Sequence, residues 1–169
     1  YVLDIGGFGK AEMGLRQEKT TNATSGEIET TAYSDIPGFA DTSAGKVYNN
    51  TFYITIVALV LGITWLLTAV LTGIGKLKLS AKIVTIFVLL TMIFAIAAPG
   101  YFAAVLPGAM KDDSGGTWDK GFMGSEEILT VKWTWGPGYG WYLAVVAFVL
   151  ALIGLILVLL KKKAPVAAP

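Results

Sequence analysis

Cysteine and histidine are both absent from the 169-residue sequence. Without cysteine the chain has no disulfide, no thiolate nucleophile and no thiolate metal ligand. Without histidine it lacks the commonest metal ligand and the side chain that most often transfers protons near neutral pH. We therefore expect a protein that is not an enzyme and that carries neither a cofactor nor a metal.

Charge is also absent from three long stretches, residues 52–75, 83–106 and 139–160. Each stretch exceeds the ~20 residues that a helix needs to cross ~30 Å of hydrocarbon. In lipid a helix satisfies every backbone hydrogen bond within the segment, so isolated spans of this kind are helical. The sequence predicts a membrane all-α bundle with three transmembrane helices, at 51–75, 83–106 and 139–160, together with a small extracellular β-containing region.

Lysines without acidic neighbours indicate which ends of these helices face the cytoplasm. They are Lys76, Lys78 and Lys82 in the turn at 76–82, and Lys161, Lys162 and Lys163 in the tail at 161–169. All twelve acidic residues lie elsewhere in the chain. By the positive-inside rule the turn and the tail are cytoplasmic. We expect a multi-pass protein of the cell membrane, with residues 1–50 and 107–138 on the extracytoplasmic side.

The sequence begins with Tyr1, which is consistent with either a removed signal peptide or a preceding helix. Either alternative places Tyr1 outside. Aromatic residues next to the predicted spans agree with this orientation, because amphipathic rings favour the membrane interface. Those expected to make contacts at the outer interface are Trp133, Trp135, Tyr139 and Trp141.

The extracytoplasmic segments contain several patterns typical of short strands. Tyr1–Ile5 and Glu27–Tyr33 are rich in β-branched or alternating residues, whereas Lys10–Thr21 fits either a strand or a short helix. Residues 126–135 alternate between an aromatic-aliphatic side and a polar side, and they predict one strand that leads into the last helix. We expect these strands to form a small sheet.

Proline divides the second predicted helix. Pro99-Gly100 either ends this helix near Ala98 or bends it so that it continues to Leu106, and a structural bend is favoured over a cavity-shaping role. Pro107-Gly108 is expected to end the helix.

Two Asn-X-Thr triplets lie in the first outer segment, at Asn22 and Asn49. Both fit glycosylation acceptors, and an unmodified surface loop is an equally good interpretation of each. Asn49 is also close to the predicted bilayer. Acidic residues at 112–113, 119 and 126–127 lack calcium-loop spacing and favour an ordinary solvated surface.

Small and mildly polar residues recur at helical spacing within the predicted spans, where they favour close helix packing. In the third span they are Ala144, Ala147, Ala151 and Gly154, and in the first they are Thr64, Thr68 and Thr72. The threonine hydroxyls bond either across helices or back to their own helix. Three helices leave many faces uncovered, so we expect a further helix or a neighbouring subunit.

Residues 126–163 contain a predicted tryptophan-rich strand that precedes a final helix with a lysine tail. With a helix before Tyr1, this layout resembles that of the claudin-like tetraspan membrane proteins. The resemblance implies lateral assembly and adhesive contacts outside the cell. It covers the layout only, because residues 1–50 lack the family's Trp-Gly-Leu-Trp signature and its cysteine pair.

No acidic or basic side chain lies within the predicted spans, which disfavours a proton or ion path through a single copy. We expect a non-catalytic protein that acts by assembly, as a structural or accessory subunit of a larger membrane complex or as a homo-oligomer. Its expected partners are membrane lipids and other membrane subunits or copies of itself, and not nucleic acid. The alternative is a small channel or transporter subunit, with the Pro99 bend beside the threonine stripe.

Overall fold

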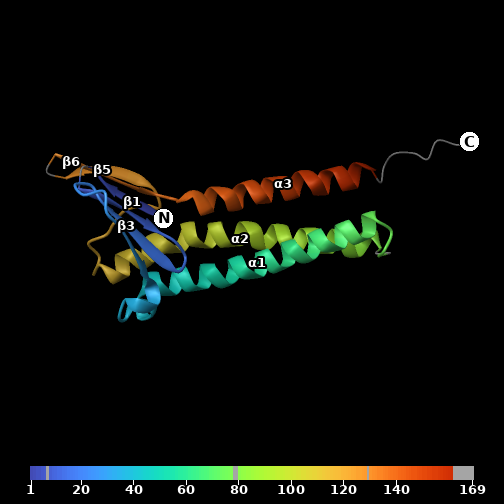
Figure 1. Ribbon diagram of the computed structural model, residues 1–169, viewed down its shortest axis with the longest axis horizontal. Coiled ribbons are helices and arrows are strands. Elements are labelled where there is room, and N and C mark those ends of the chain that lie inside the picture. The colour runs from blue at the N-terminus through green and yellow to red at the C-terminus, as the bar shows by residue number, and fades with distance from the viewer. Residues whose placement is uncertain (7, 78–79, 129, 162–169) are drawn as a thin grey trace, which may run out of the picture. The chain divides into compact units, whose positions relative to one another are not determined.

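The computed structural model describes residues 1–6, 8–77, 80–128 and 130–161 (Figure 1). Lys78, Lys162 and Lys163, which the sequence analysis assigns to the cytoplasmic side, lie outside these residues. The chain divides into two compact units. The sheet unit comprises Tyr1–Tyr53 and Ala98–Tyr142, and the helical unit comprises Ile54–Ala97 and Leu143–Pro169. Each unit is described by itself.

The sheet unit contains a six-stranded antiparallel sheet in the described residues. Its strands are β1 (Val2–Ile5), β2 (Gly9–Met13), β3 (Gln17–Asn22), β4 (Ile28–Ala32), β5 (Gly124–Ile128) and β6 (Val131–Gly136), in the spatial order β4-β3-β2-β1-β6-β5. The two outer segments predicted from the sequence therefore build one sheet, and this sheet is larger than the small region expected.

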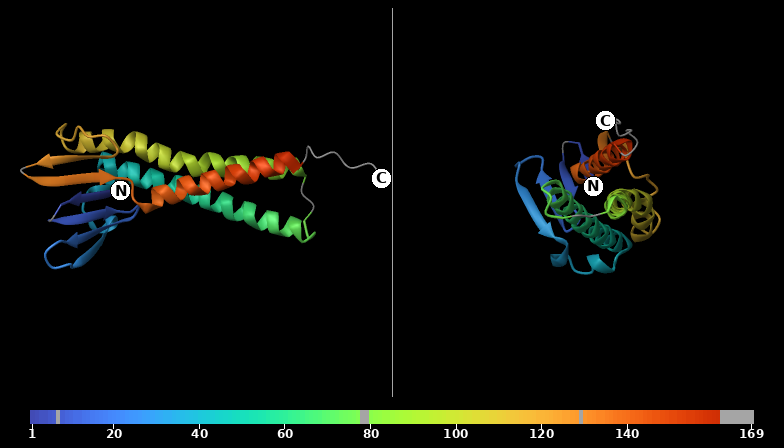
Figure 2. Two further views of the ribbon diagram at one scale, coloured as in Figure 1. Left: turned by 90° about the horizontal axis from the view of Figure 1, so that it is seen from above. Right: turned by 90° about the vertical axis from the view of Figure 1, so that its right-hand side faces the viewer.

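The centre of the sheet joins the beginning of the chain to residues far along it. β1 lies between β2 and β6, and Leu3 and Asp4 are the Cα partners of Trp135 and Thr134. The β1–β2, β3–β4 and β5–β6 hairpins all turn at the same end of the sheet (Figure 2). The other end leads to the helices through Gly136 and the residues that follow it.

Two sequence predictions within the sheet change. The segment Lys10–Thr21, for which both a strand and a short helix fitted, contributes to the hairpin of β2 and β3, which is closed by a bond from the Gly14 amide to the Gln17 carbonyl at 2.8 Å. The prediction of a single strand at 126–135 is wrong, because the chain reverses direction between β5 and β6. Thr130 takes a φ of 67° there, a left-handed conformation for which a threonine gives no sequence signal.

Three α-helices occur in the described residues: α1 (Ser43–Gly73), α2 (Ala81–Asp113) and α3 (Tyr139–Lys161). α1 begins before residue 51, because the Thr42 hydroxyl accepts a bond from the Gly45 amide at 2.9 Å and so caps the first turn. α1 ends where Gly75 adopts a φ of 74° and the Lys76 amide bonds to the Leu71 carbonyl.

The prediction that Pro107-Gly108 ends the second helix is wrong. α2 contains both Pro99 and Pro107 and continues to Asp113. Each proline removes a single backbone donor, and its fixed φ is compatible with the helix, so the surrounding helical bonds can tolerate the loss. Of the two alternatives at Pro99, the structure has the one in which the helix continues.

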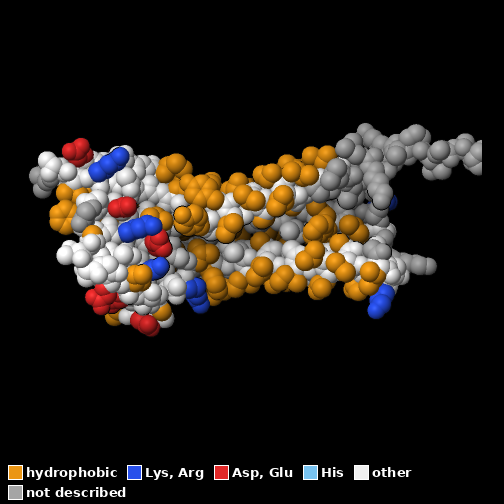
Figure 3. Space-filling view, turned by 45° about the horizontal axis from the view of Figure 1, so that its top comes forward, with side chains coloured by type: hydrophobic (Ala, Val, Ile, Leu, Met, Phe, Trp, Pro, Cys, Tyr) orange, Lys and Arg blue, Asp and Glu red, His pale blue; other side chains and the backbone are white. Residues whose placement is uncertain are grey.

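Two of these helices are long and apolar enough to cross a membrane, over Ser43–Thr72 and Lys82–Asp113. Within α3 the described residues give a shorter apolar stretch, Tyr139–Ile153. Hydrophobic side chains cover the helices on the visible face, whereas acidic and most basic side chains gather over the strands (Figure 3). The charge-free stretches and the charged segments identified in the sequence thus remain distinct on the surface of each unit.

The core of the sheet unit is an aromatic cluster. Tyr1, Val47, Tyr48, Phe102 and Leu106 are all buried in it, and Leu106 is 1% exposed. In the helical unit Val88 and Met92 are buried, and a Cβ on Gly62 of α1 would lie 3.7 Å from Thr91 of α2. The main hydrophobic packing between the strands and the helices therefore lies inside the sheet unit.

Candidate functional site

A carboxylate joins the end of α2 to the beginning of α1 within the sheet unit. The two Asp113 carboxylate oxygens accept hydrogen bonds from the backbone amides of Ser43 and Ala44, each at 2.7 Å. The first amides of a helix have no partner within the helix, and its N-terminus attracts negative charge. Asp113 therefore holds the end of α2 beside the beginning of α1, where both helices line the pocket that is described below.

Three aromatic rings form one wall of this pocket. Tyr33 and Phe39 stack with their centroids 4.2 Å apart, and Tyr48 meets Tyr33 edge-on at 5.4 Å. The Tyr48 hydroxyl donates to the Met13 sulfur at 3.4 Å, which connects the wall to β2. These rings are brought together by two short 3-10 turns at Tyr33–Asp35 and Phe39–Asp41.

Trp118 forms the opposite wall, and Trp135 packs against it. Trp118 packs edge-on against Trp135 of β6 with centroids 5.5 Å apart, and the Trp135 indole donates to the Gly121 carbonyl at 3.0 Å. The Trp118 amide donates to the Ser114 hydroxyl at 2.9 Å, which holds the chain beyond α2 in place. The Trp118 ring is thereby positioned by both the helix end and the sheet.

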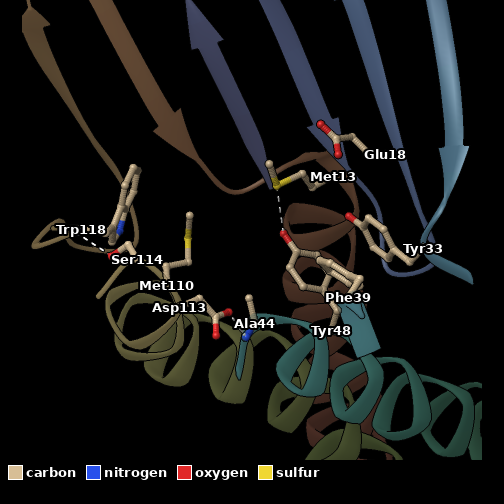
Figure 4. A pocket seen from close by; sticks show the side chains of 10 residues that line it. All are labelled: Met13, Glu18, Tyr33, Phe39, Ala44, Tyr48, Met110, Asp113, Ser114 and Trp118. Atoms are coloured by element: carbon tan, nitrogen blue, oxygen red, sulfur yellow. Dashed lines mark hydrogen bonds between the residues drawn. The ribbon is translucent and has the colours of Figure 1, made fainter. Parts of the chain in front are cut away.

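Between these walls lies a pocket of about 330 Å³, which lies entirely within the sheet unit (Figure 4). This volume is at the lower end of the ~300–1,000 Å³ typical of small-molecule sites. Besides the aromatic rings, its lining includes the thioethers of Met13 and Met110 and the carboxylates of Glu18 and Asp113. None of the described residues that line it is basic.

Two residues at the pocket have buried polar side-chain atoms: the Tyr33 hydroxyl interacts with that of Tyr48, and the Trp118 indole nitrogen has no hydrogen-bond partner in the described residues. Burial, with a smaller contribution from the charge of Glu18, raises the pKa of Tyr33 above its ordinary value. Tyr33 is therefore a neutral phenol at physiological pH.

The residues predicted for helix packing lie in the helical unit. Thr64, Thr68 and Thr72 are half-buried, and their hydroxyls donate to carbonyls of α1 itself, at 2.7–2.8 Å. On α3, Ala144 and Ala151 are half-buried and Ala147 is exposed. The surroundings of Gly154 lie outside the described residues. The proposed packing role of both faces stays a prediction.

The aromatic residues predicted for the outer interface take different positions within the sheet unit. Trp133 and Trp135 belong to β6, and Trp135 packs against Trp118. The Trp141 indole donates to the Pro99 carbonyl of α2 at 3.1 Å, whereas Tyr139 is 85% exposed. The indole nitrogens of Trp135 and Trp141 thus have hydrogen-bond partners, and Tyr139 is the most exposed of the four residues.

The two glycosylation candidates also differ. Asn22 lies at the end of β3 and is exposed, and its side-chain oxygen accepts bonds from the amides of Thr24 and Ser25. Asn49 lies inside α1, where Arg16 donates to it at 3.5 Å. Because an acceptor triplet is modified on a flexible surface segment, Asn22 is the better candidate.

The acidic residues that were weighed as calcium ligands are dispersed. Asp119 pairs with Lys111 at 3.0 Å and Glu126 with Lys120 at 2.6 Å, whereas Asp113 caps α1. Within the described residues no three acidic, cysteine or histidine side chains come together as a metal site.

The pocket was not predicted from the sequence, because its walls come from separate segments of the chain. The only signal was the spacing of Tyr33, Phe39 and Tyr48 around a Pro-Gly turn, which identifies no ligand. No protein-family model matches the sequence, and neither a curated protein nor a solved structure matches it. The function must therefore be argued from this chain alone.

The Asp113 cap can be tested with Asp113→Asn, which retains the shape and removes the charge. We expect this variant to be less stable by ~1 kcal/mol, because a charged cap at a helix N-terminus is lost. Thermal unfolding of the purified protein, followed by near-UV circular dichroism, measures the difference. Asp112→Asn, at an exposed neighbouring position, is the matched control. Equal unfolding temperatures for the two variants would show that the cap contributes nothing.

Proposed function

We propose that this chain is a multi-pass membrane protein that acts by assembly and not by catalysis. The observation that supports membrane insertion best is the exposed apolar surface of the helical unit. Leu59, Leu66 and Val70 of α1 and Ile86 and Ile93 of α2 are each more than half exposed. A surface of this kind requires lipid or another protein, because it would otherwise associate in water.

In this proposal α1, α2 and α3 are the three spans. Lys76 and Lys82 flank the connection between α1 and α2, and no acidic residue lies there. Short basic connections of this kind stay in the cytoplasm, which places the sheet unit on the extracytoplasmic side. The six strands would then form an outer platform at the cell surface.

Assembly is supported by surfaces of both units that are exposed in the part of the chain that the structure describes. β4 and β5 are the edges of the sheet, and edge strands can pair with a further strand. Ile28 on β4 is 56% exposed and Ile128 on β5 is 43% exposed. On α3, the small side chain of Ala147 is exposed where another helix could approach closely.

A claudin-like layout belongs to the same proposal. Such a protein places a sheet outside the membrane on a helical bundle, and β6 leads into α3 here through Gly136-Pro137-Gly138. Assembly side by side with copies of itself or with subunits of a larger membrane complex is the activity that this layout implies.

A channel or transporter subunit is the second candidate. One observation weighs against it, namely that the hydroxyls of Thr64, Thr68 and Thr72 are bonded to their own helix and so do not offer a continuous polar path. We therefore retain assembly as the proposed function.

The proposed assembly predicts different outcomes for two substitutions on α3. Ala147→Leu fills the small-residue face, whereas Val149→Phe adds comparable bulk at an exposed position about 200° around the helix. We expect Ala147→Leu to reduce the particle mass and Val149→Phe to leave it unchanged, as measured by native mass spectrometry after mild detergent extraction. A wild-type protein that is extracted from its own membrane only as a lone monomer would contradict the proposal.

The proposed orientation predicts one glycan when the chain, preceded by a cleavable signal peptide, is translated into microsomes. Asn22 is then on the lumenal side and exposed, whereas Asn49 is held in α1. We expect one endoglycosidase-sensitive shift on a gel, lost in Asn22→Gln and retained in Asn49→Gln. A further triplet placed in the tail at 161–169 should stay unmodified. Modification of the tail triplet would show that the tail is lumenal and would contradict the proposed topology.

A further inference from the structure

The chemistry of the pocket in the sheet unit identifies a class of ligand that the assembly proposal does not require. Its walls are the rings of Tyr33, Phe39 and Tyr48 on one side and Trp118 on the other (Figure 4). We propose that this pocket binds a small organic cation of the alkylammonium or quaternary ammonium class.

Glu18 supplies the negative charge that such a ligand requires. It lies on β3 opposite Met13 of β2 and is half-buried at the pocket. Among the described residues its carboxylate takes part in none of the ion pairs, which join Lys10 to Glu12, Lys111 to Asp119 and Lys120 to Glu126. Asp113, the other acid at the pocket, is already engaged by two backbone amides. Glu18 is thus the carboxylate left free to meet a cation.

The aromatic and thioether lining favours an organic cation over an inorganic one. The faces of tyrosine, phenylalanine and tryptophan rings carry partial negative charge and attract alkylated ammonium groups, which are weakly hydrated. Met13 and Met110 add soft, polarisable surface for the alkyl groups. A small hard cation would instead require several converging oxygen ligands, and no three acidic side chains come together in the described residues.

An anion is disfavoured at this site by the same residues. The described lining holds two carboxylates and no lysine or arginine. Choline, a small quaternary ammonium ion, carries the charge that this lining favours.

Choline and 3,3-dimethyl-1-butanol have the same shape and differ in charge, so this pair tests the proposal. Each is titrated into the purified full chain by isothermal titration calorimetry. We expect choline to bind more tightly than the neutral alcohol by about five- to thirtyfold, the range for a cation on aromatic faces. Equal affinities for the two, or no binding of either, would overturn the proposal.

Substitutions at Glu18 separate the charge from the fold. Glu18→Gln should remove most of the preference for choline, and Glu18→Asp should retain it. Glu29→Gln, on the exposed part of β4, is the matched control and should bind as the wild type does. A Glu18→Gln protein that keeps both its near-UV circular dichroism and its preference for choline would contradict the role of this carboxylate.

Free cations and lipid headgroups carry the same ammonium group, and the surrounding bilayer distinguishes them. The choline titration is repeated in nanodiscs of phosphatidylcholine and of digalactosyldiacylglycerol, a neutral lipid that has no ammonium group. An apparent choline affinity that is lower in phosphatidylcholine identifies the lipid headgroup as a competitor. Equal affinities identify the free cation as the ligand, and choline binding that is absent in both nanodiscs would contradict the proposal.

Discussion

The pairing of β1 with β6 is the interaction on which the rest of the sheet unit depends. It joins Val2–Ile5 to residues 133–136 and so unites a four-stranded meander with a separate hairpin. Contacts between such distant segments have a large entropic cost, which hydrogen bonds and burial must offset. Tyr1 and Trp135 lie at this junction, and both pack in or against the aromatic core.

The pocket follows from this pairing. Once β6 is placed beside β1, Trp135 positions the Trp118 ring, and β2 and β3 carry Met13 and Glu18 to the opposite side. The Asp113 cap then holds the ends of α1 and α2 together beneath the strands. Each wall is therefore supported by packing or hydrogen bonds within the same unit, which keeps the site preorganised.

The sequence predicts the helices well and their ends poorly. Three charge-free stretches locate α1, α2 and α3, because an apolar stretch of about 20 residues is typical of a helix that can cross a membrane. The start of α1 has a local cap in Thr42 and a second cap in Asp113, which lies seventy positions away and leaves no local pattern. Pro107 reads locally as a helix end, but α2 continues through it. The turn at Thr130 lacks glycine or asparagine, so alternation made two strands look like one. The pocket was beyond prediction because its lining is assembled from several separate segments of the chain.

Because the native chain has no cysteine, a designed disulfide can test the β1–β6 pairing directly. Asp4 and Thr134 are Cα partners across the two strands. In Asp4→Cys/Thr134→Cys, mild oxidation should give an intramolecular disulfide, detected as a mobility shift on a non-reducing gel. The register-shifted pair Asp4→Cys/Lys132→Cys should stay largely reduced under the same conditions. Equal or faster oxidation of the shifted pair would contradict this register and, with it, the sheet on which the pocket is built.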